Sequence, residues 1–493
     1  MRKETRTLDC PVFVDQGILF KKEGIQMKRI VTLLLAAGLV LGAAAGSQAA
    51  DIKAKGIWQN NLSWADRAVS SDNNGDYFRA STRLRTQIDV IASESLKGVV
   101  FFEIGHQNWG EAKSGAALGN DGKEVKVRYS YVDWVIPQTD AKVRMGLQPF
   151  GVPTFAVPMA VLDTDGAGIT VSGQFTENVG AALFWLRPYN DYSNRMDGTY
   201  GNKHDAMDVV GLTVPLTFDG VKVTPFGMYS IIGRDTEFGA GGNNKTGVAA
   251  GLLPAGADAH WGAKLDDHGN AWWGGITAEM TLFDPFRVAA DFAYGSVDMG
   301  NVGNFDMKRS GWYAALAGEY KLDYMTPALT FWYASGDDKN ANDGSERMPV
   351  IDSDVALTSY GFDGGTYNRS ATFNGTSLAG TWGIVAELKD ISFMEDLSHV
   401  LRVGFIQGTN NSGMLVKNGG TVASMTGVGN DLYLTHHDRM WEVNIDTQYN
   451  IYQNLTLAFE LGYINLDYDE NLWGSNTYNE NNFKAAMSLN YKF

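Results

Sequence analysis

Hydrophobic and polar residues alternate with a period of two along several stretches of the chain. The segments 78–90 and 441–451 follow this pattern, and so does the final stretch FKAAMSLNYKF. A segment of about ten such residues is long enough for a tilted strand to cross a bilayer, whereas the strands of a soluble sandwich are usually shorter. The pattern therefore predicts membrane-spanning β-strands that are hydrophobic on one face. In the final stretch the hydrophobic side holds Phe483, Ala485, Met487, Leu489, Tyr491 and Phe493.

Eighteen segments of this kind follow one another, and a miscounted hairpin would reduce the number to sixteen. Short connections, such as 93–95 and 177–178, alternate with long ones, such as 65–76 and 233–270. Such an alternation is typical of bacterial outer-membrane barrels, which have short periplasmic turns and long external loops. The expected strands cover residues 51–64, 77–92, 96–107, 123–136, 141–148, 169–176, 179–187, 208–218, 221–232, 271–283, 287–297, 310–322, 328–335, 378–391, 400–408, 439–452, 455–467 and 483–493.

A spanning sheet must pair all its backbone polar groups, and it does so by closing on itself. The fold class expected is therefore all-β, a transmembrane antiparallel β-barrel of 16–18 strands, eighteen by count. A barrel of this width is too wide for side chains to fill, so it encloses an aqueous channel. The connection 149–168 is the third long one along the chain.

The N-terminal segment has the features of an export signal. Met27-Lys28-Arg29 precedes an uncharged apolar run over 30–45, and small residues follow up to Ala49. This order predicts a signal peptide cleaved after Ala49, with Met27 as a possible true start. The chain then divides into a leader, 1–49, and a single barrel domain, 50–493. The only cysteine, Cys10, lies in the leader, so no disulfide is expected in the exported protein.

Charge and hydropathy narrow the class of protein. The chain has 40 basic and 56 acidic residues, and the leader holds seven of the former and four of the latter. The remainder, with 33 basic and 52 acidic residues, has a net charge of −19, which argues against nucleic acid as a partner. The run 30–45 is the only long apolar stretch, which excludes a membrane protein built from several helical spans.

Four features together carry a family resemblance. They are the signal peptide, the opening IKAKGIW, the run VRYSYVDWVIPQTDAKVRMGLQPFGVP and the terminal phenylalanine. On these the chain resembles the homotrimeric outer-membrane porins of sulfate-reducing bacteria. The resemblance implies a trimer, a passive diffusion channel without a cofactor, and a third loop folded into the lumen, here 149–168. The commonest trimeric porins have sixteen strands, so the count of eighteen departs from them.

The resemblance also implies partners. These are outer-membrane lipid and lipopolysaccharide, further copies of the chain, and the barrel assembly machinery. In such porins that machinery reads the terminal aromatic strand, which assigns the assembly signal here to Tyr491 and Phe493. The expected location is the outer membrane of a Gram-negative bacterium.

Basic residues gather on the polar faces of the early strands. Period-two spacing directs them into the lumen, opposite two carboxylates of the third loop, Asp163 and Asp165. Opposed rows of this kind would create a transverse field at a constriction. The alternative is that the basic residues pair with Glu103, Glu124 and Asp89 and stiffen the wall; both can hold at once. The basic set comprises Arg79, Arg83, Arg85, Lys126, Arg128, Lys142 and Arg144.

The function expected is a general diffusion porin for small hydrophilic solutes. A substrate-selective porin for anions or sugars is the main alternative. A barrel enzyme would need Ser–His or Asp–His pairs, and the histidine positions supply no convincing one, while a structural surface protein remains an option. No cofactor is expected, and an EF-hand over 338–349 is excluded because position twelve is Pro349. Loose Ca²⁺ binding is conceivable only at loop carboxylates: Asp72, Asp76, Asp266 and Asp267.

Overall fold

The computed structural model describes most of the chain after the leader. The described residues are 50–66, 76–119, 125–190, 206–234, 236, 251–252, 267–302, 305–340, 342–362, 364–365, 373–416, 425 and 432–493. The expected signal peptide, Asp72, Glu124 and Asp266 therefore lie outside the described residues.

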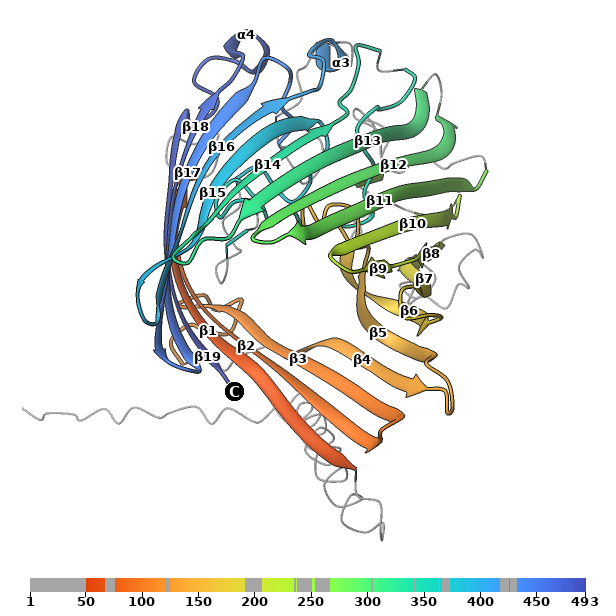
Figure 1. The fold of residues 1–493 in the computed structure, drawn as a ribbon. Coiled ribbons are helices and arrows are strands. Elements are labelled where there is room, and N and C mark those ends of the chain that lie inside the picture. Colours follow the sequence, from red (N-terminus) through yellow and green to blue (C-terminus); the bar gives the residue numbers. More distant parts are fainter. Residues whose placement is uncertain are drawn as a thin grey trace, which may run out of the picture.

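The strands form one closed antiparallel barrel (Figure 1). The described residues form nineteen strands, but β8 and β9 both pair with β10 and make one spanning strand that is interrupted at Val214 and Pro215. The barrel therefore has eighteen strands, as counted from the sequence. The strands are β1 Asp51–Asp66, β2 Asp76–Ser93, β3 Leu96–Asn108, β4 Val125–Val135, β5 Lys142–Gly151, β6 Asp163–Gln174, β7 Gly180–Asn190, β8 Ala206–Thr213, β9 Leu216–Phe218, β10 Val221–Ile232, β11 Gly269–Phe283, β12 Phe286–Val302, β13 Phe305–Tyr320, β14 Thr326–Ala334, β15 Thr381–Met394, β16 Leu397–Gly408, β17 Arg439–Tyr452, β18 Leu455–Asp467 and β19 Asn481–Lys492.

The last strand closes the barrel on the first. β19 pairs with β1 from Ile57–Lys492 to Ala65–Lys484. At the seam Gly56 N–H donates to the Phe493 carbonyl at 2.8 Å, and Phe493 N–H donates back to Gly56 at 3.1 Å. A Cβ on Gly56 would meet the Phe493 ring at 2.5 Å, so only glycine fits there. The terminal residue is thus part of the closed ladder.

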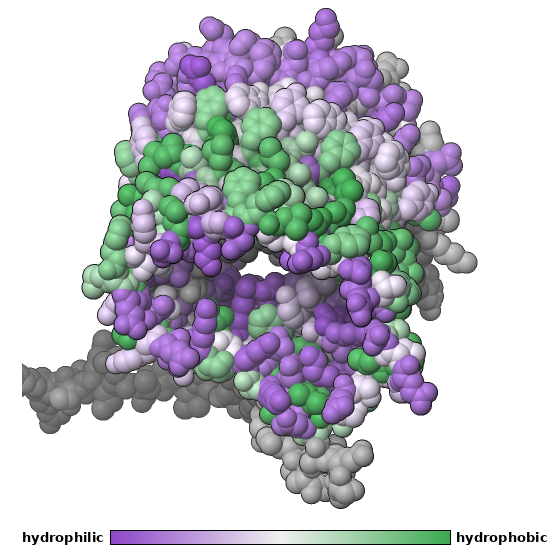
Figure 2. All heavy atoms as spheres, in the orientation of Figure 1, coloured by the Kyte–Doolittle hydropathy of each residue, from purple (hydrophilic) through white to green (hydrophobic). Residues whose placement is uncertain are grey.

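Side chains on the strands are hydrophobic outside and polar inside. In β17, Trp441 and Ile445 are exposed on the outer face, whereas Glu442, Asn444 and Asp446, which alternate with the outward residues, are buried in the interior. This is the reverse of a soluble protein and matches a barrel wall surrounded by lipid. Hydrophobic residues form a broad band across the surface, below a hydrophilic rim of connecting segments (Figure 2).

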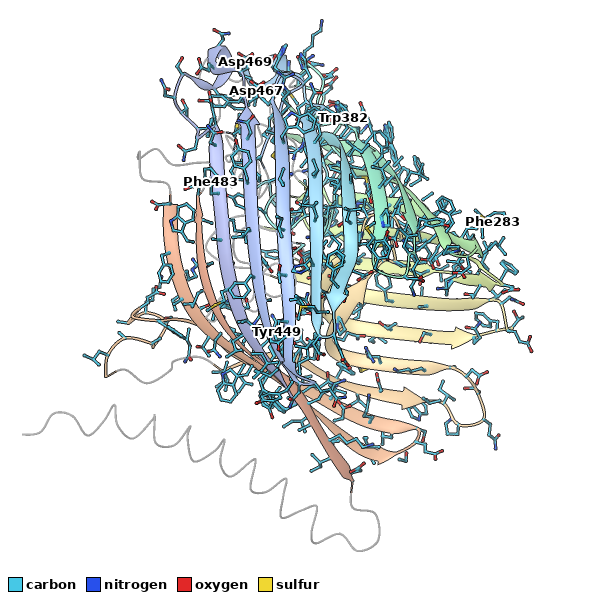
Figure 3. The ribbon with its side chains drawn as sticks, turned by 60° about the vertical axis from the view of Figure 1, so that its left-hand side comes forward. Phe283, Trp382, Tyr449, Asp467, Asp469 and Phe483 are labelled. Atoms are coloured by element: carbon cyan, nitrogen blue, oxygen red, sulfur yellow. The ribbon has the colours of Figure 1, made fainter. Side chains whose placement is uncertain are left out.

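The two ends of the barrel differ. Figure 3 shows Tyr449 and Phe483 on the wall strands, and Asp467 and Asp469 at the upper end, where the long connections lie. Within the described part of these connections lie two short helices, α3 Gly413–Val416 and α4 Glu470–Trp473. Within the described residues, no helix has the length and apolar character needed to cross a membrane.

The third long connection is shorter than expected. β5 continues to Gly151 and β6 already begins at Asp163, where these two residues pair, so the loop is 152–162 instead of 149–168. Asp163 and Asp165 therefore belong to β6 and not to the loop. The strand was hidden by its glycines, which have low strand propensity. A Cβ on Gly168 would meet the Trp185 carbonyl oxygen at 2.0 Å, so glycine is required where the chains approach closely.

Candidate functional site: a lumen crossed by two loops

The loop 152–162 crosses the lumen to the opposite wall. Its backbone N–H groups at Phe155, Ala156 and Val157 donate to the Asp291 carboxylate on β12 at 2.8, 2.9 and 2.8 Å. Thr277 on β11 donates to the same carboxylate and accepts a further bond from Phe155 N–H at 2.9 Å. Asp291 is thus a buried anchor for the loop.

Small side chains make room for this contact. Ala289 and Ala293, which flank Asp291 at period-two spacing, share its lumenal face and are fully or almost fully buried. An acidic residue between alanines is the signal that sequence reasoning missed. The pattern Ala–x–Asp–x–Ala gives a wall with space beside a strong acceptor.

A second loop, residues 335–380 between β14 and β15, also folds inward. Its Gly361 N–H and Thr358 hydroxyl donate to the Glu442 carboxylate on β17, both at 2.8 Å. Ser359 donates to Asp446 at 2.9 Å, and the Lys484 ammonium on β19 donates to the Ser359 carbonyl. This loop is therefore fixed to the wall formed by β17 and β19.

The two loops are joined to each other. Asp352 forms a parallel bridge with Leu162, and its carbonyl accepts from Asp163 N–H at 2.9 Å. Thr164 donates to the Asp352 carboxylate at 2.6 Å, and Asp354 N–H donates to Met159 at 3.0 Å. Together, residues 152–162 and 349–362 form a hydrogen-bonded element from β12 to β17, which we call the strap.

The seven basic residues expected in the lumen lie on β2, β4 and β5. Arg79, Arg83 and Arg85 pair in register with Ser63, Gln59 and Ile57 of β1, on the face that carries the buried polar residues of that strand. Lys126 is opposite Glu103, whereas Lys142 and Arg144 are opposite Val135 and Asp133. The role of this set at a constriction stays a prediction.

Most of these basic side chains contact partners on neighbouring strands. Arg85 Nε lies 2.5 Å from Glu103, and Arg144 Nε lies 2.6 Å from Asp133, which Lys142 also contacts at 2.9 Å. Arg83 donates to Gln59 at 2.9 Å. These contacts include the pairing with Glu103 that was expected if the residues stiffen the wall.

One contact joins the basic row to the carboxylates expected opposite it. Arg128 Nε donates to Asp165 at 2.8 Å, and its guanidinium lies 5.5 Å from the Tyr129 ring centre. Asp163 instead takes part in the junction of the strap through its backbone N–H. The two carboxylates therefore occupy different surroundings, although they are two residues apart.

The strap leaves arginines of β2 and β5 partly accessible and buries the polar side chains of β17 and β19, on the other side of β1. The Arg85 and Arg144 side chains are 25% and 23% exposed, whereas those of Asp446 and Lys484 are 5% and 1% exposed. Figure 2 shows an opening through the molecule that is rimmed largely by hydrophilic residues. The unfilled part of the lumen thus borders the arginines of β2 and β5.

The second loop also carries a group of three carboxylates. Oxygens of Asp338, Asp343 and Glu346 lie within 4.8 Å of one another, the one such group among the described residues. Asp76 and Asp267, the described members of the expected loose calcium set, do not belong to it. Burial, together with Asp337 and Asp338 nearby, raises the pKa of Glu346 to about 7. Repulsion between the three explains part of this rise.

Comparisons with known proteins bear on the fold. A scan of protein-family models found no match, and a search of curated protein sequences found none either. Among solved structures, the chain is similar to the outer membrane protein OprD from Pseudomonas aeruginosa, with a TM-score of 0.51, 12% identity and coverage of 92% of this chain and 96% of that one.

The chain is also similar to two further solved structures. OccAB1 from Acinetobacter baumannii matches with a TM-score of 0.51 at 9% identity, over 92% of this chain and 99% of that one. OpdL from Pseudomonas aeruginosa gives the same score and identity over 90% and 99%. The chain therefore has the fold of these outer-membrane proteins, a closed barrel of eighteen strands. The resemblance to trimeric porins of sulfate-reducing bacteria stays a prediction.

Proposed function

We propose that the protein is a porin of the Gram-negative outer membrane, a channel through which small hydrophilic solutes and ions diffuse passively. The observation that carries this is the barrel itself. Its outer face is hydrophobic, its inner face is polar, and the strap fills only part of the lumen beside an accessible polar wall. A protein that only covered the surface would have no need for an open polar interior. The protein works without a catalytic centre.

Conductance tests this function directly. Purified protein in a planar bilayer should give discrete current steps whose size grows in proportion to salt concentration, because ions cross a water-filled lumen. A folded protein that inserts into the bilayer and carries no current would contradict the proposal and would favour a structural role.

The basic wall favours a second candidate, a channel selective for small anionic solutes. Seven basic residues lie on β2, β4 and β5, and among the described residues ion pairs join Arg85 to Glu103, Arg128 to Asp165, and both Lys142 and Arg144 to Asp133. Basic side chains beside the narrow part of a pore attract anions. Saturable block of the current by one small carboxylate, but not by its uncharged amide, would distinguish this candidate from general diffusion.

The proposed porin function extends to the oligomeric state and the partners of the protein. We infer a homotrimer in contact with outer-membrane lipid and lipopolysaccharide, inserted by the barrel assembly machinery through its terminal strand. We infer no resident cofactor, and only loose Ca²⁺ at loop carboxylates. Light scattering in detergent tests the trimer, and a monomeric mass would refute it.

A further inference from the structure

The ladder between β4 and β5 ends halfway up the barrel wall. The two strands pair only from Val135–Lys142 to Ser130–Leu147. β4 continues over 125–129 and β5 over 148–151, and all these residues are described, but they do not pair with each other. Figure 1 shows the two strands diverging from the turn that joins them. The wall is therefore split along this seam.

The sequence of β5 encodes the end of the ladder. Val152 N–H donates to Leu162 on the β6 side, and strand residues alternate in the direction of their backbone groups. Pro149 therefore turns its nitrogen toward β4, where it has no hydrogen to donate. Proline is confined to edges of this kind, since it cannot continue a ladder.

The upper part of β5 has moved away from the wall. Gln148 and Phe150 are almost fully buried, and Gln148 donates to the Gly168 carbonyl at 2.9 Å. The chain then enters the strap and reaches Asp291 on the opposite wall. The hairpin of β5 and β6 is thus drawn inward, and among the described residues no strand pairs with the upper edge of β4 on that side.

The seam lies within the membrane. Six residue pairs at about 3.4 Å each, in strands tilted by about 40°, raise the end of the ladder about 15 Å above the short turn. The apolar band of such barrels is about 25 Å tall, so the split begins inside it. Open strand edges are not tolerated against lipid, which means that water or a polar ligand must satisfy them.

Exposed apolar side chains and basic side chains meet at the edge of β4. Val125 and Val127 are 65% and 47% exposed on the outer face. Lys126 alternates with them, and Arg128 lies at the register shift next to Val127, held by Asp165 of β6 across the seam. A cationic edge behind an apolar rim suits an anionic head group attached to an apolar tail.

We propose that this seam is a lateral portal, through which the anionic head of an amphiphile dissolved in the outer leaflet enters the lumen while its tail stays in the membrane. This portal rests on the proposed channel function, because the head group needs a water-filled lumen to enter. The portal gives amphiphiles a second route into the lumen, through the wall and not along the barrel axis.

Cross-linking tests whether the seam is open. Residues 50–493 contain no cysteine, so introduced pairs are unique. Arg128→Cys with Pro149→Cys, both accessible, would oppose each other if the ladder continued, whereas Val132→Cys with Met145→Cys sit in the paired part. A short bifunctional thiol reagent should bridge only the second pair. Bridging of both would overturn the portal, and so would a disulfide between two chains through Val127→Cys, because a second copy would then seal the seam.

Current block tests whether amphiphiles use it. Dodecanoate in the bilayer should reduce the ion current of the native protein, whereas dodecanol, which lacks the charge, should not. Val127→Trp places a bulky ring at the outer rim and should remove the block by dodecanoate, with the potassium chloride conductance and the effect of soluble butyrate unchanged. Persistence of the block in this variant would overturn the portal. The conductance itself tests the channel separately, so the two proposals fail independently.

Discussion

Releasing the strap from Asp291 should enlarge the channel. Asp291→Ala removes the acceptor of three backbone N–H groups, and one of them, from Phe155, keeps Thr277 as a partner. The N–H groups of Ala156 and Val157 donate to the Asp291 carboxylate and lose this acceptor. A buried donor left unsatisfied costs about 1–3 kcal/mol, so docking of the loop weakens by about 2–6 kcal/mol.

The loss of docking free energy sets how often the larger conductance level is observed. A loss of about 2 kcal/mol changes the ratio of docked to undocked loop about thirtyfold. Asp291→Asn keeps one acceptor oxygen and should fall near the low end, with brief visits to a larger conductance level. Asp291→Ala should show the larger level most of the time. The Arg287 contact to the Phe155 carbonyl, at 3.1 Å, remains in both variants.

Single-channel recording in planar bilayers measures both levels, and exclusion of polymers of increasing size reports the width. Asp208→Asn is the matched control, because this carboxylate contacts Arg187 on β7 and not the loop. The reasoning is refuted if Asp291→Ala, shown to be folded by its shift in gel mobility on heating, has native conductance and native open-channel noise.

Four further predictions concern other parts of the molecule. Replacing Arg79, Arg83 and Arg85 together by glutamine should shift the reversal potential in a salt gradient toward cations; an unchanged potential would place them outside the ion path. Asp165→Asn releases the Arg128 guanidinium and should shift the potential toward anions, whereas Asp163→Asn, which leaves the backbone contact with Asp352 intact, should shift it less. Deleting Phe493 should lower the yield of folded protein in the outer membrane, and a native yield would remove its role in assembly. The pKa of Glu346 is raised from 4.5 to about 7, so the folded loop binds a proton more tightly than the unfolded loop. The packing of the loop around Glu346 should therefore weaken as pH rises from about 4.5 to about 7. Hydrogen exchange of this loop should become faster over that range in the native protein and not in Glu346→Gln.

The strands were predictable because lipid imposes a strict pattern on them. The expected segments 221–232, 439–452 and 455–467 coincide with β10, β17 and β18 at both ends. A spanning strand must place a hydrophobic side chain outward at every second position over about ten residues, and each strand therefore carries its own signal. Short turns between them add a second, independent signal.

The path of the inward loops was not predictable in the same way. Loop 335–380 is held by Glu442 and Lys484, which lie 81 and 125 residues along the chain from the residues that they contact, Gly361 and Ser359. Contacts of this kind depend on the closed barrel and leave no local period in the sequence. The carboxylates Asp163 and Asp165 were assigned to the loop because the following glycines hide the strand, and only the pairing with β5 shows where β6 begins.

Closure of the barrel through Phe493 constrains the order of events during biogenesis. β1 is the first strand to leave the ribosome and β19 is the last, yet each is the other's neighbour. The edge of β1 that pairs with β19 consequently has no native partner until synthesis and export of the whole chain are complete. Until then this edge is open to pairing, and a free strand edge recruits other chains. Strand-by-strand insertion from the N-terminus cannot produce a sealed wall, and a chain truncated anywhere before its last strand is an aggregation hazard rather than a smaller channel.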